Sequence, residues 1–273
     1  MVNILKGAPV ADAIYEELSK MNGANPLLSI IKYKGTDAGG YLKGLTKSAN
    51  RVNARLQVTE VEHYDELLKT VQEMGANDCV SGVLLLKPFP KDWNFREAVK
   101  LLPPSKDVDA LHPVNLGLLA QNLALLMPAT PQSIIQILDF YNIPIEGKNI
   151  LVIGRSEAVG LPAALMLLHR NGTVTIAHSR TKDIPSLSVK ADILVVAIGK
   201  AHFVNETFVK NGAVVIDVGT NMTDDGKVVG DVDFDSVMPL VSAITPVPGG
   251  VGSVTTACLF KNLFTCYYMN HSA

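Results

Sequence analysis

The sequence predicts an α/β protein with two domains, the second built on a doubly wound parallel sheet. From residue 149 onward, short runs rich in Val and Ile alternate with stretches of helical periodicity. The runs lack the polar alternation of half-exposed strands, which favours strands that helices cover on both faces. Such an alternation of strands and helices is typical of a parallel sheet with helices packed on each side.

Several elements of the second domain can be placed from this pattern. We expect strands at 149–154, 173–179, 193–199 and 213–219, and a helix at 159–172 that ends at Gly172. A further helix is expected at 129–142, where Thr130 can cap the first turn and Pro131 takes the first helical position. We place the hinge between the two domains around this helix.

The chain before the hinge predicts a separate α/β unit. Helices are expected at 8–21, 41–52 and 64–75, and strands at 27–33, 55–59 and 81–86. At the carboxyl end, the apolar residues of 253–267 fall on one face of a helix. Periodicity alone does not tell which domain this helix covers.

Composition and charge exclude several classes of protein. Of the 273 residues, 48% are apolar and 18% charged, and the formal net charge is −2. This balance favours a globular protein over a disordered chain or a basic nucleic-acid binder. No apolar run approaches the roughly 20 residues of a membrane helix, and the amino-terminal segment becomes acidic too early for a signal peptide. We therefore expect a cytoplasmic protein that binds neither nucleic acid nor membrane.

The cysteines and histidines argue against a disulfide framework and a metal centre. Cys79, Cys258 and Cys266 have no Cys-x-x-Cys spacing, and an odd number suits a reducing compartment where they are small buried hydrophobic residues. The six histidines are far apart and show no metal-ligand spacing. The sequence therefore predicts no metal site.

The segment LVIGRSEAVGLP at 151–162 is the first candidate for ligand binding. A predicted strand leads into Gly154, and Gly160 opens the following helix. In such a turn, glycines let backbone amides approach a pyrophosphate, and the helix amino terminus adds positive potential. The loop has two glycines where the usual dinucleotide fingerprint has three, with Arg155 and Ser156 between them.

The end of the next predicted strand indicates which dinucleotide is bound. A cofactor with a free ribose 2′-hydroxyl meets an acidic residue there, whereas this chain has His178, Ser179 and Arg180. A hydroxyl and a cation suit a 2′-phosphate, and Arg155 adds a second cation. The pattern favours NADP over NAD. The alternative is that both arginines are solvated surface charges.

A second glycine-rich loop, PVPGGVGS at 246–253, joins the last predicted strand to the carboxyl-terminal helix. Its prolines and glycines define a rigid turn whose backbone can approach a ligand. Gly249 and Gly250 are therefore candidates for contact with the reactive end of the cofactor, although the loop could also be a mere connection.

Together these segments resemble the methylenetetrahydrofolate dehydrogenase/cyclohydrolase family. The matching text is VIGRSEAVGLP, TVTIAHSRT, KADILVVAIGK, GAVVIDVGTN, GKVVGDVDF, ITPVPGGVGSVTT, KDVDALHPVNLG and PATP, with a looser match in VLLLKPFP. The resemblance implies a folate-binding domain at 1–128 plus 256–273, to which the carboxyl-terminal helix returns. It also implies a Rossmann-like NADP-binding domain at 129–255, a folate cleft between the domains, and a homodimer.

The same resemblance implies roles for individual residues. The NADP contacts correspond to Gly154, Arg155, Ser156 and Ser179, with Thr220 beside the cofactor. Asp109 matches the family's aspartate, and its carboxylate suits the adjacent N–H donors of a pterin. Tyr41 matches the family's tyrosine, whose ring can stack on folate. As alternatives, Asp109 could cap a turn and Tyr41 could be half-buried packing.

Two catalytic polar positions of the family are leucine in this chain. The family lysine four residues after the tyrosine falls on Leu45, and the glutamine of a VQLPLP-like motif falls on Leu86, whereas Lys47 matches the family's second lysine. Further departures from the family pattern are Ala38 for serine, Ala110 for glycine, Ala129 for cysteine, Ser133 for glycine and Ser253 for proline.

These leucines predict the loss of one of the family's two activities. Hydride transfer from 5,10-methylenetetrahydrofolate to NADP needs mainly that donor and acceptor carbons be aligned. The cyclohydrolase step adds water to the methenyl product and needs a polar group, which is worth ~10²–10⁴ in rate. Leucine supplies none, so we expect an NADP-dependent dehydrogenase with weak or absent cyclohydrolase activity.

Three alternatives stay open at this point. Activation of water by Lys43, Lys47 or Lys87 would preserve the full bifunctional enzyme. A dehydrogenase of similar architecture that acts on shikimate is a different enzyme class. An intact cofactor loop beside an altered substrate side would also suit a non-catalytic, NADP-binding regulatory homologue.

Overall fold

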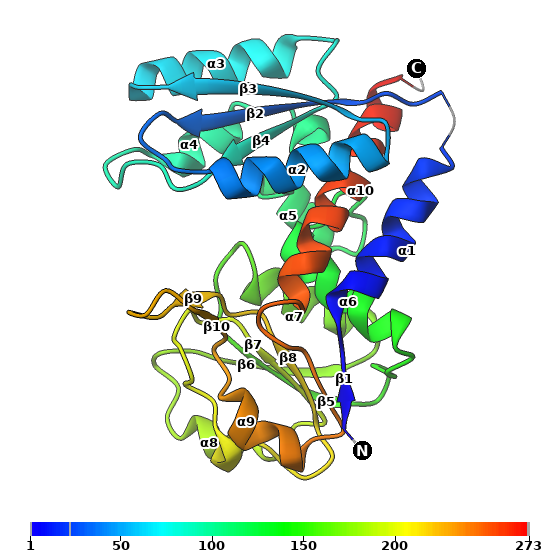
Figure 1. Ribbon diagram of the computed structural model, residues 1–273, viewed down its shortest axis with the longest axis vertical. Helices are drawn as coiled ribbons and strands as arrows, with labels where there is room; N and C mark the ends of the chain where they lie inside the picture. The colour runs from blue at the N-terminus through cyan, green and yellow to red at the C-terminus, as the bar shows by residue number, and fades with distance from the viewer. Residues whose placement is uncertain (1, 22, 272–273) are drawn as a thin grey trace. The chain divides into compact units, whose positions relative to one another are not determined.

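The computed structural model describes residues 2–21 and 23–271, which fall into two compact units. The six-stranded unit joins the chain up to Asp12 with Thr130–Thr255, and the three-stranded unit contains Ala13–Ala129 and the chain from Thr256 onward. Figure 1 shows both units, which are described separately below.

The six-stranded unit is a parallel sheet in the order β1-β11-β8-β7-β5-β6. Its strands are β1 (Asn3–Ile4), β5 (Asn149–Ile153), β6 (Thr173–Ala177), β7 (Ile193–Val196), β8 (Val214–Asp217) and β11 (Ala243–Ile244). Its helices are α6 (Ala129–Phe140), α7 (Gly160–His169), α8 (Ile184–Ser188) and α9 (Phe234–Val237), and a hairpin pairs β9 (Asn221–Met222) with β10 (Val228–Val229).

The strand order reverses at β5. The chain passes from β5 to β6 on one side and then to β7 on the other, so β5 lies between them. The expected strands at 149–154, 173–179, 193–199 and 213–219 are all present, each slightly shorter than predicted. Strands β5 and β7 are buried almost throughout, which explains why they read as continuous apolar runs.

The amino-terminal strand belongs to this sheet and not to the first domain. Asn3 and Leu5 donate backbone hydrogen bonds to the carbonyls of Ser242 and Ile244, at 2.8 Å each. The predicted boundary had placed the whole of 1–128 in the folate-binding domain. The strand is two residues long, too short for any periodicity to reveal it.

The three-stranded unit is a parallel sheet in the order β3-β2-β4. Its strands are β2 (Leu27–Tyr33), β3 (Arg55–Val61) and β4 (Gly82–Leu86). Its helices are α2 (Gly39–Arg51), α3 (Tyr64–Ala76), α4 (Phe95–Lys100) and α5 (Pro113–Ala120). Figure 1 shows α2 and α3 on opposite faces of this sheet, and the face under α3 and α4 forms a core with Ile31, Val83 and Leu85.

Two further helices, α1 (Gly7–Ser19) and α10 (Val251–His271), each contain a point where the chain passes from one unit to the other, and the third such point lies between Ala129 and Thr130 at the start of α6. Within the three-stranded unit, most of α10 up to Cys266 is buried, and its last turn, from Tyr268 to His271, is exposed. Asn262 of α10 donates to the carbonyls of Val108 and Met127, at 2.8 and 2.7 Å. These bonds hold the segment that carries Asp109.

Short 3-10 turns at Pro104–Lys106, Glu206–Phe208 and Met238–Leu240 complete the secondary structure, and helix α6 begins at Ala129, one residue before the expected cap. Cys258 and Cys266 are buried as expected, whereas Cys79 is exposed. Among residues 2–21 and 23–271, no helix is long and apolar enough to span a membrane, and no three His, Cys, Asp or Glu side chains gather as metal ligands.

Candidate functional site

The loop after β5 lies at the point where the strand order reverses. In doubly wound sheets, ligands bind at the carboxyl ends of the strands at such a point. Gly154 has φ of +125°, and a Cβ there would lie 2.2 Å from the carbonyl oxygen of Ala197. A Cβ on Gly160 would lie 2.3 Å from the carbonyl oxygen of Gly154. Both positions therefore require glycine, and the turn leaves its backbone open to a ligand.

Helix α7 begins within this loop and points its amino terminus toward the same edge. The hydroxyl of Ser156 accepts hydrogen bonds from the amides of Val159 and Gly160, at 3.2 and 3.4 Å. Arg155 and Ser156 are exposed. The helix dipole and the exposed guanidinium of Arg155 together suit a pyrophosphate.

The turn after β6 lies directly beside this loop, because Ile153 and Ala177 are register partners at the ends of their strands. The amide of Thr181 donates to the carbonyl of His178 at 2.8 Å, and the amide of Arg180 donates to its ring Nδ1 at 3.2 Å. These bonds fix a tight turn that leaves Ser179 and Arg180 exposed. Two cationic side chains and a hydroxyl thus follow two adjacent strands.

The remaining predicted cofactor residues follow strands on the other side of β5. Thr220 comes after β8 and is exposed. Gly249 has φ of +98° and accepts a hydrogen bond from the amide of Gly7 at 2.8 Å. A Cβ on Gly250 would lie 2.4 Å from the carbonyl oxygen of Pro246. The predicted contacts therefore lie along one edge of one sheet, and this arrangement fits a dinucleotide.

Asp109 lies in the three-stranded unit, after the bridge that pairs Asp107 with Val83. The pKa of Asp109 is raised to about 7, mainly by burial and in part by the negative charge of Asp107, while the charge of Lys87 lowers it. Asp107 itself accepts from the amide of His112 at 2.6 Å. The raised pKa marks Asp109 as a candidate functional carboxyl, and its role stays a prediction beside the turn cap considered above.

The residue after Asp109 explains part of this geometry. Ala110 has φ of +52° and is fully buried, although the family pattern has glycine there. A non-glycine residue in this left-handed region costs roughly 1–2 kcal/mol. The turn that follows Asp109 therefore carries backbone strain at Ala110.

The charge of Asp109 acts on the hydroxyl of Tyr41. Burial of its hydroxyl raises the pKa of Tyr41 to about 12, and the charge of Asp109 contributes to the rise. The side chain as a whole nevertheless keeps 41% of its surface exposed. An exposed ring with a sheltered hydroxyl suits stacking on a flat ligand. Tyr41 and Asp109 are therefore close enough to interact electrostatically, and the roles that the resemblance implies for them stay predictions.

The two leucines differ from each other in their surroundings. Leu45 is 0% exposed on the buried face of α2, where the neighbouring Ser48 accepts a hydrogen bond from Tyr15 at 2.8 Å. Leu86 is the last residue of β4 and is partly exposed. Position 45 consequently presents no surface to a ligand in this unit, whereas position 86 does.

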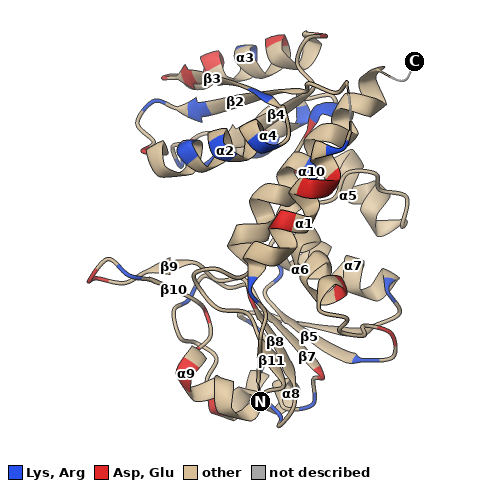
Figure 2. Ribbon diagram, turned by 45° about the vertical axis from the view of Figure 1, so that its right-hand side comes forward, with Lys and Arg blue, Asp and Glu red and all other residues tan. Residues whose placement is uncertain are grey.

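The lysines considered as substitutes are exposed. Lys43 and Lys47 lie on α2, which also carries Arg51 and no acidic residue (Figure 2). Lys87 follows β4, with Nζ 3.8 Å from the ring centroid of Phe95. Of the three, Lys87 is the one whose charge acts on Asp109.

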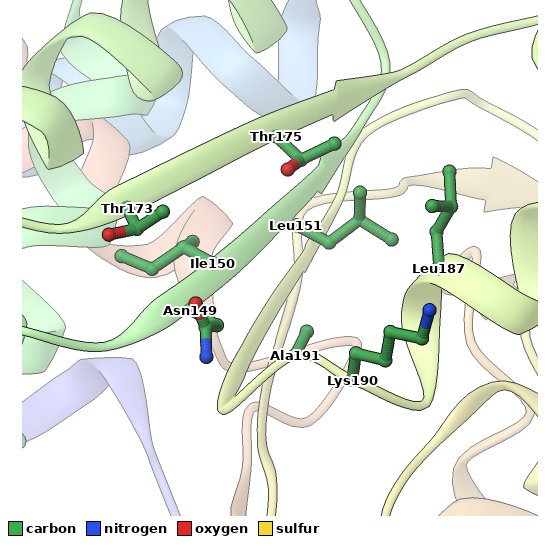
Figure 3. A pocket seen from close by; sticks show the side chains of 8 residues that line it. All are labelled: Asn149, Ile150, Leu151, Thr173, Thr175, Leu187, Lys190 and Ala191. Atoms are coloured by element: carbon green, nitrogen blue, oxygen red, sulfur yellow. The ribbon is translucent and has the colours of Figure 1, made fainter.

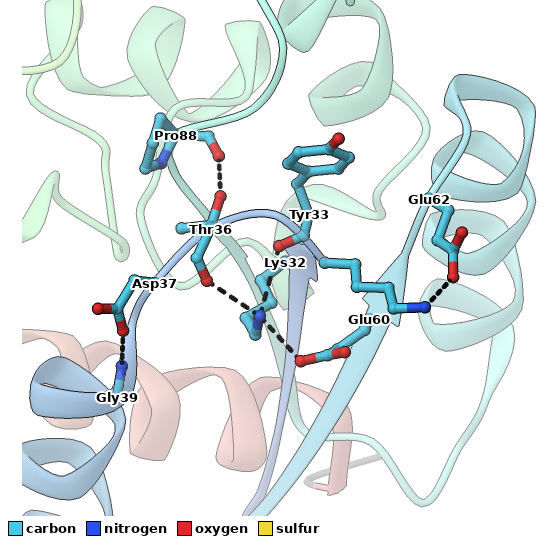
Figure 4. Close-up of polar contacts among 9 residues, drawn as sticks. Lys32, Tyr33, Thr36, Asp37, Gly39, Glu60, Glu62 and Pro88 are labelled. Atoms are coloured by element: carbon cyan, nitrogen blue, oxygen red, sulfur yellow. Dashed lines mark hydrogen bonds and ion pairs between the residues drawn. The ribbon is translucent and has the colours of Figure 1, made fainter.

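Sequence reasoning missed a buried lysine beside Leu86. Lys32 is 6% exposed and pairs in register with both Leu86 and Glu60. Its Nζ donates to the carbonyl of Thr36 at 3.1 Å and forms an ion pair with Glu60 at 2.9 Å (Figure 4). Thr36 in turn donates to the carbonyl of Pro88 at 2.6 Å. Lys32 thus anchors the loop before α2. A charged residue within the apolar run LLSIIKY was the available signal.

Two cavities lie away from these residues. One cavity of about 260 Å³ opens beside α8, at the amino ends of β5 and β6, which begin at Asn149 and Thr173 (Figure 3). The other, of about 720 Å³, lies between α2 and the edge strand β3, where it is lined by Thr46 and Leu56 among others. Neither contains a predicted site residue.

Comparison with known proteins identifies both units. Residues 128–271 match the family model described as the tetrahydrofolate dehydrogenase/cyclohydrolase NAD(P)-binding domain, and residues 5–109 match the catalytic domain of the same family. The bifunctional protein FolD of Coprothermobacter proteolyticus is 68% identical over 268 residues, which cover 98% of each chain.

Solved structures agree with these matches. The bifunctional 5,10-methylenetetrahydrofolate dehydrogenase/cyclohydrolase of Thermoplasma acidophilum is similar with a TM-score of 0.94 and 35% identity, covering 99% of this chain and 100% of the other. The FolD enzyme of Trypanosoma brucei, in complex with NADP cofactor and inhibitor, is similar with a TM-score of 0.92 and 32% identity, covering 100% and 99%.

Proposed function

Because the chain belongs to the tetrahydrofolate dehydrogenase/cyclohydrolase family, we propose that it is an NADP-dependent 5,10-methylenetetrahydrofolate dehydrogenase with weak or absent cyclohydrolase activity. The observation that carries the second part is Leu45. A side chain without any exposed surface cannot orient or deprotonate a water molecule.

The preference for NADP rests on the two neighbouring loops after β5 and β6. Arg155, Ser179 and Arg180 are exposed there. A guanidinium binds phosphate by charge-assisted hydrogen bonds, so this group favours a cofactor with a 2′-phosphate. The Trypanosoma brucei relative was solved with NADP, which supports the same choice.

Bound NADP supplies the hydride acceptor, and the residues of this chain bind and orient the two reactants. On the substrate side, Asp109 would accept from the N–H donors of the pterin, and Tyr41 would stack on it. No side chain needs to exchange a proton during hydride transfer. The loss of a lysine cation should not hinder a step that leaves positive charge on the folate.

A second candidate is the full bifunctional enzyme. Asp109 has a pKa raised to about 7 and lies within the influence of the Lys87 charge. A carboxyl that titrates near neutral pH can accept a proton from water. This pair is the alternative group that could support the cyclohydrolase step. The match to catalytic-domain residues 5–109 argues against a shikimate dehydrogenase.

We further propose that the protein works in the cytoplasm as a homodimer. The proposal of a reducing compartment is supported by three cysteines that form no disulfide in the described chain. The homodimer rests on the family resemblance, and size-exclusion chromatography with light scattering tests it. A monomer at micromolar concentration would contradict it.

A paired assay on the purified protein tests the proposed activities. One reaction measures reduction of NADP and of NAD with 5,10-methylenetetrahydrofolate, and the other measures loss of methenyltetrahydrofolate above its uncatalysed hydrolysis. Reduction without accelerated hydrolysis is the expected result. Acceleration of both reactions would favour the bifunctional enzyme, and binding of NADP without either activity would favour the regulatory homologue.

A further inference from the structure

Two buried aspartates, Asp217 and Asp231, connect the loops at the carboxyl edge of the six-stranded sheet. Asp217 is the last residue of β8 and is 3% exposed, while Asp231 follows β10 and is 0% exposed. Neither is among the expected cofactor contacts. Buried carboxylates are costly unless they are fully hydrogen-bonded, so the hydrogen-bond partners of each show what it holds in place.

Asp231 holds the loop that follows β7. Its Oδ2 accepts from the amides of Ile198 and Gly199, at 2.7 and 3.0 Å, and its Oδ1 accepts from the amide of Lys200 at 2.8 Å. Oδ1 also accepts from Nδ2 of Asn221 at 2.9 Å. Three successive amides form a nest that suits an anion. An internal carboxylate fills this nest and fixes the backbone of the loop.

Asp217 holds the loop that follows β8. Its Oδ1 accepts from the amides of Gly219 and Asp231, at 2.9 and 3.1 Å, and its Oδ2 accepts from the amide of Val232 at 3.0 Å. Its own amide donates to the hydroxyl of Thr245 at 2.8 Å, just after β11. Three strand ends are thereby joined through one side chain and its backbone.

Two glycines make room for these carboxylates. A Cβ on Gly219 would lie 2.3 Å from Cγ of Asp231, and a Cβ on Gly230 would lie 1.8 Å from Oδ2 of Asp217. The motifs Asp-Val-Gly at 217–219 and Gly-Asp-Val at 230–232 thus fit each other reciprocally. We name the pair of Asp217 and Asp231 the carboxylate clamp.

The clamp lies at the ends of those strands that we expect to be next to the nicotinamide half of the cofactor. The proposed 2′-phosphate contacts follow β6, and the pyrophosphate loop follows β5. A dinucleotide that starts over β6 and crosses β5 must extend over β7 and β8, the next strands in order. The loops after those two strands are the ones that the clamp holds.

We propose that the carboxylate clamp positions the loops after β7 and β8 against the nicotinamide half of NADP and so sets its alignment for hydride transfer. This inference rests on the proposed function. Asp217 and Asp231 are positioning residues, because they act through backbone amides and do not touch the cofactor themselves. A small misplacement of reacting atoms lowers rate far more than it lowers binding of remote groups.

The test compares Asp231→Asn with Asp233→Asn. The amide introduced by Asp231→Asn would turn an N–H₂ group toward backbone amides that now donate to a carboxylate oxygen. Asp233 lies two residues away and caps α9 by accepting from the amide of Ser236 at 3.4 Å, a role that asparagine fills equally well. The milder variant Asn221→Ala removes one of the four bonds to Asp231 and serves if Asp231→Asn does not fold.

Three kinds of measurement are made on folded protein. The first gives kcat and KM for NADP reduction, and the second gives the isotope effect on kcat with deuterium at the methylene carbon. The third gives the affinities for NADP and for adenosine 2′,5′-bisphosphate. For Asp231→Asn we expect kcat to fall about 10- to 100-fold, the isotope effect to rise, and affinity for the bisphosphate to stay within about twofold, since that fragment lacks the nicotinamide. Asn221→Ala should shift the same quantities less, and Asp233→Asn should shift none.

An unchanged kcat in Asp231→Asn would overturn the inference. A fall in kcat would also overturn it if the number of bisphosphate-binding sites fell equally and the isotope effect stayed the same. In that case only the folded fraction would be smaller, and kcat per folded molecule would be unchanged. If the wild-type protein binds both ligands but oxidises no folate, the proposed reaction fails separately. The clamp is then judged by whether Asp231→Asn weakens NADP binding relative to bisphosphate binding.

Discussion

Replacing Leu86 with glutamine should restore part of a cyclohydrolase activity, and replacing Leu45 with lysine should not. Leu86 is partly exposed at the end of β4, so Leu86→Gln gives up only part of a leucine's burial, about 1 kcal/mol. In a chain of this length that lowers Tm by about 2–4 °C. A glutamine there returns a polar group to the substrate side.

The same reasoning gives a different result at position 45. Leu45→Lys removes a fully buried leucine, worth about 1.5–3 kcal/mol, and buries an ammonium at a cost of several kcal/mol more. The sum approaches the whole stability of a typical domain, about 5–15 kcal/mol. We therefore expect Leu45→Lys to be largely unfolded by circular dichroism.

The assay follows loss of methenyltetrahydrofolate above the uncatalysed rate. For Leu86→Gln we expect a rise of about 10- to 100-fold, at or below the low end of what a placed polar group supplies, because the lysine is still missing. Leu86→Met is the control, since it keeps the position apolar. A wild-type protein that already hydrolyses this substrate rapidly, with no response to Leu86→Gln, would refute the reasoning.

Five further predictions concern residues of the two units. Arg180→Ala should raise KM for NADP about 10- to 100-fold, the effect of one charged hydrogen bond, and leave KM for NAD unchanged in steady-state assays; equal effects on both would contradict a 2′-phosphate contact. Because burial raises the pKa of Asp109 to about 7, its carboxylate form gains population between pH 6 and 8, so KM for folate should fall over that range, and Asp109→Asn should abolish the trend. The same shift means that ionisation of Asp109 destabilises the fold as pH rises from 4 through 7, so Asp109→Asn should lose less stability than wild type over that range in urea titrations. Ala110→Gly should raise stability by about 1 kcal/mol by relieving the positive φ, whereas Gly154→Ala should destabilise by more than Gly147→Ala, whose Cβ meets no atom within 4 Å.

The sequence was most informative where burial imposes a simple pattern. The runs at β5 and β7 predict their own strands because both faces are covered. Strand β1 was not predicted, and the strand before the loop at 246–253 was expected without bounds, because β1 and β11 have two residues each and are defined by backbone pairing with their neighbours. The first twelve residues were consequently placed in the other domain.

The candidate site was predictable to a similar extent. Glycine spacing and the residues after β6 indicate a phosphate site, since those features are local in sequence. The environment of Asp109 was not predictable, because its raised pKa depends on Asp107 and Lys87 in the folded chain. Nor could the depth of Leu45 be inferred from its neighbours in α2, since helical periodicity gives a face but not an exposed fraction.

These contrasts predict that the two units tolerate substitution differently. At position 219 or 230, any side chain would collide with the carboxylate of the clamp, so neither position can change alone. At position 45, exchange of lysine for leucine removes the cost of placing a cation near a core and adds apolar burial. A lysine that serves only the water-addition step can therefore be lost with a gain in stability, while the carboxyl edge that holds the dinucleotide remains fixed by its own packing. On this argument, dehydrogenase activity should survive substitutions at Leu45 that fold, such as Leu45→Met, and should fail with single substitutions at Gly219.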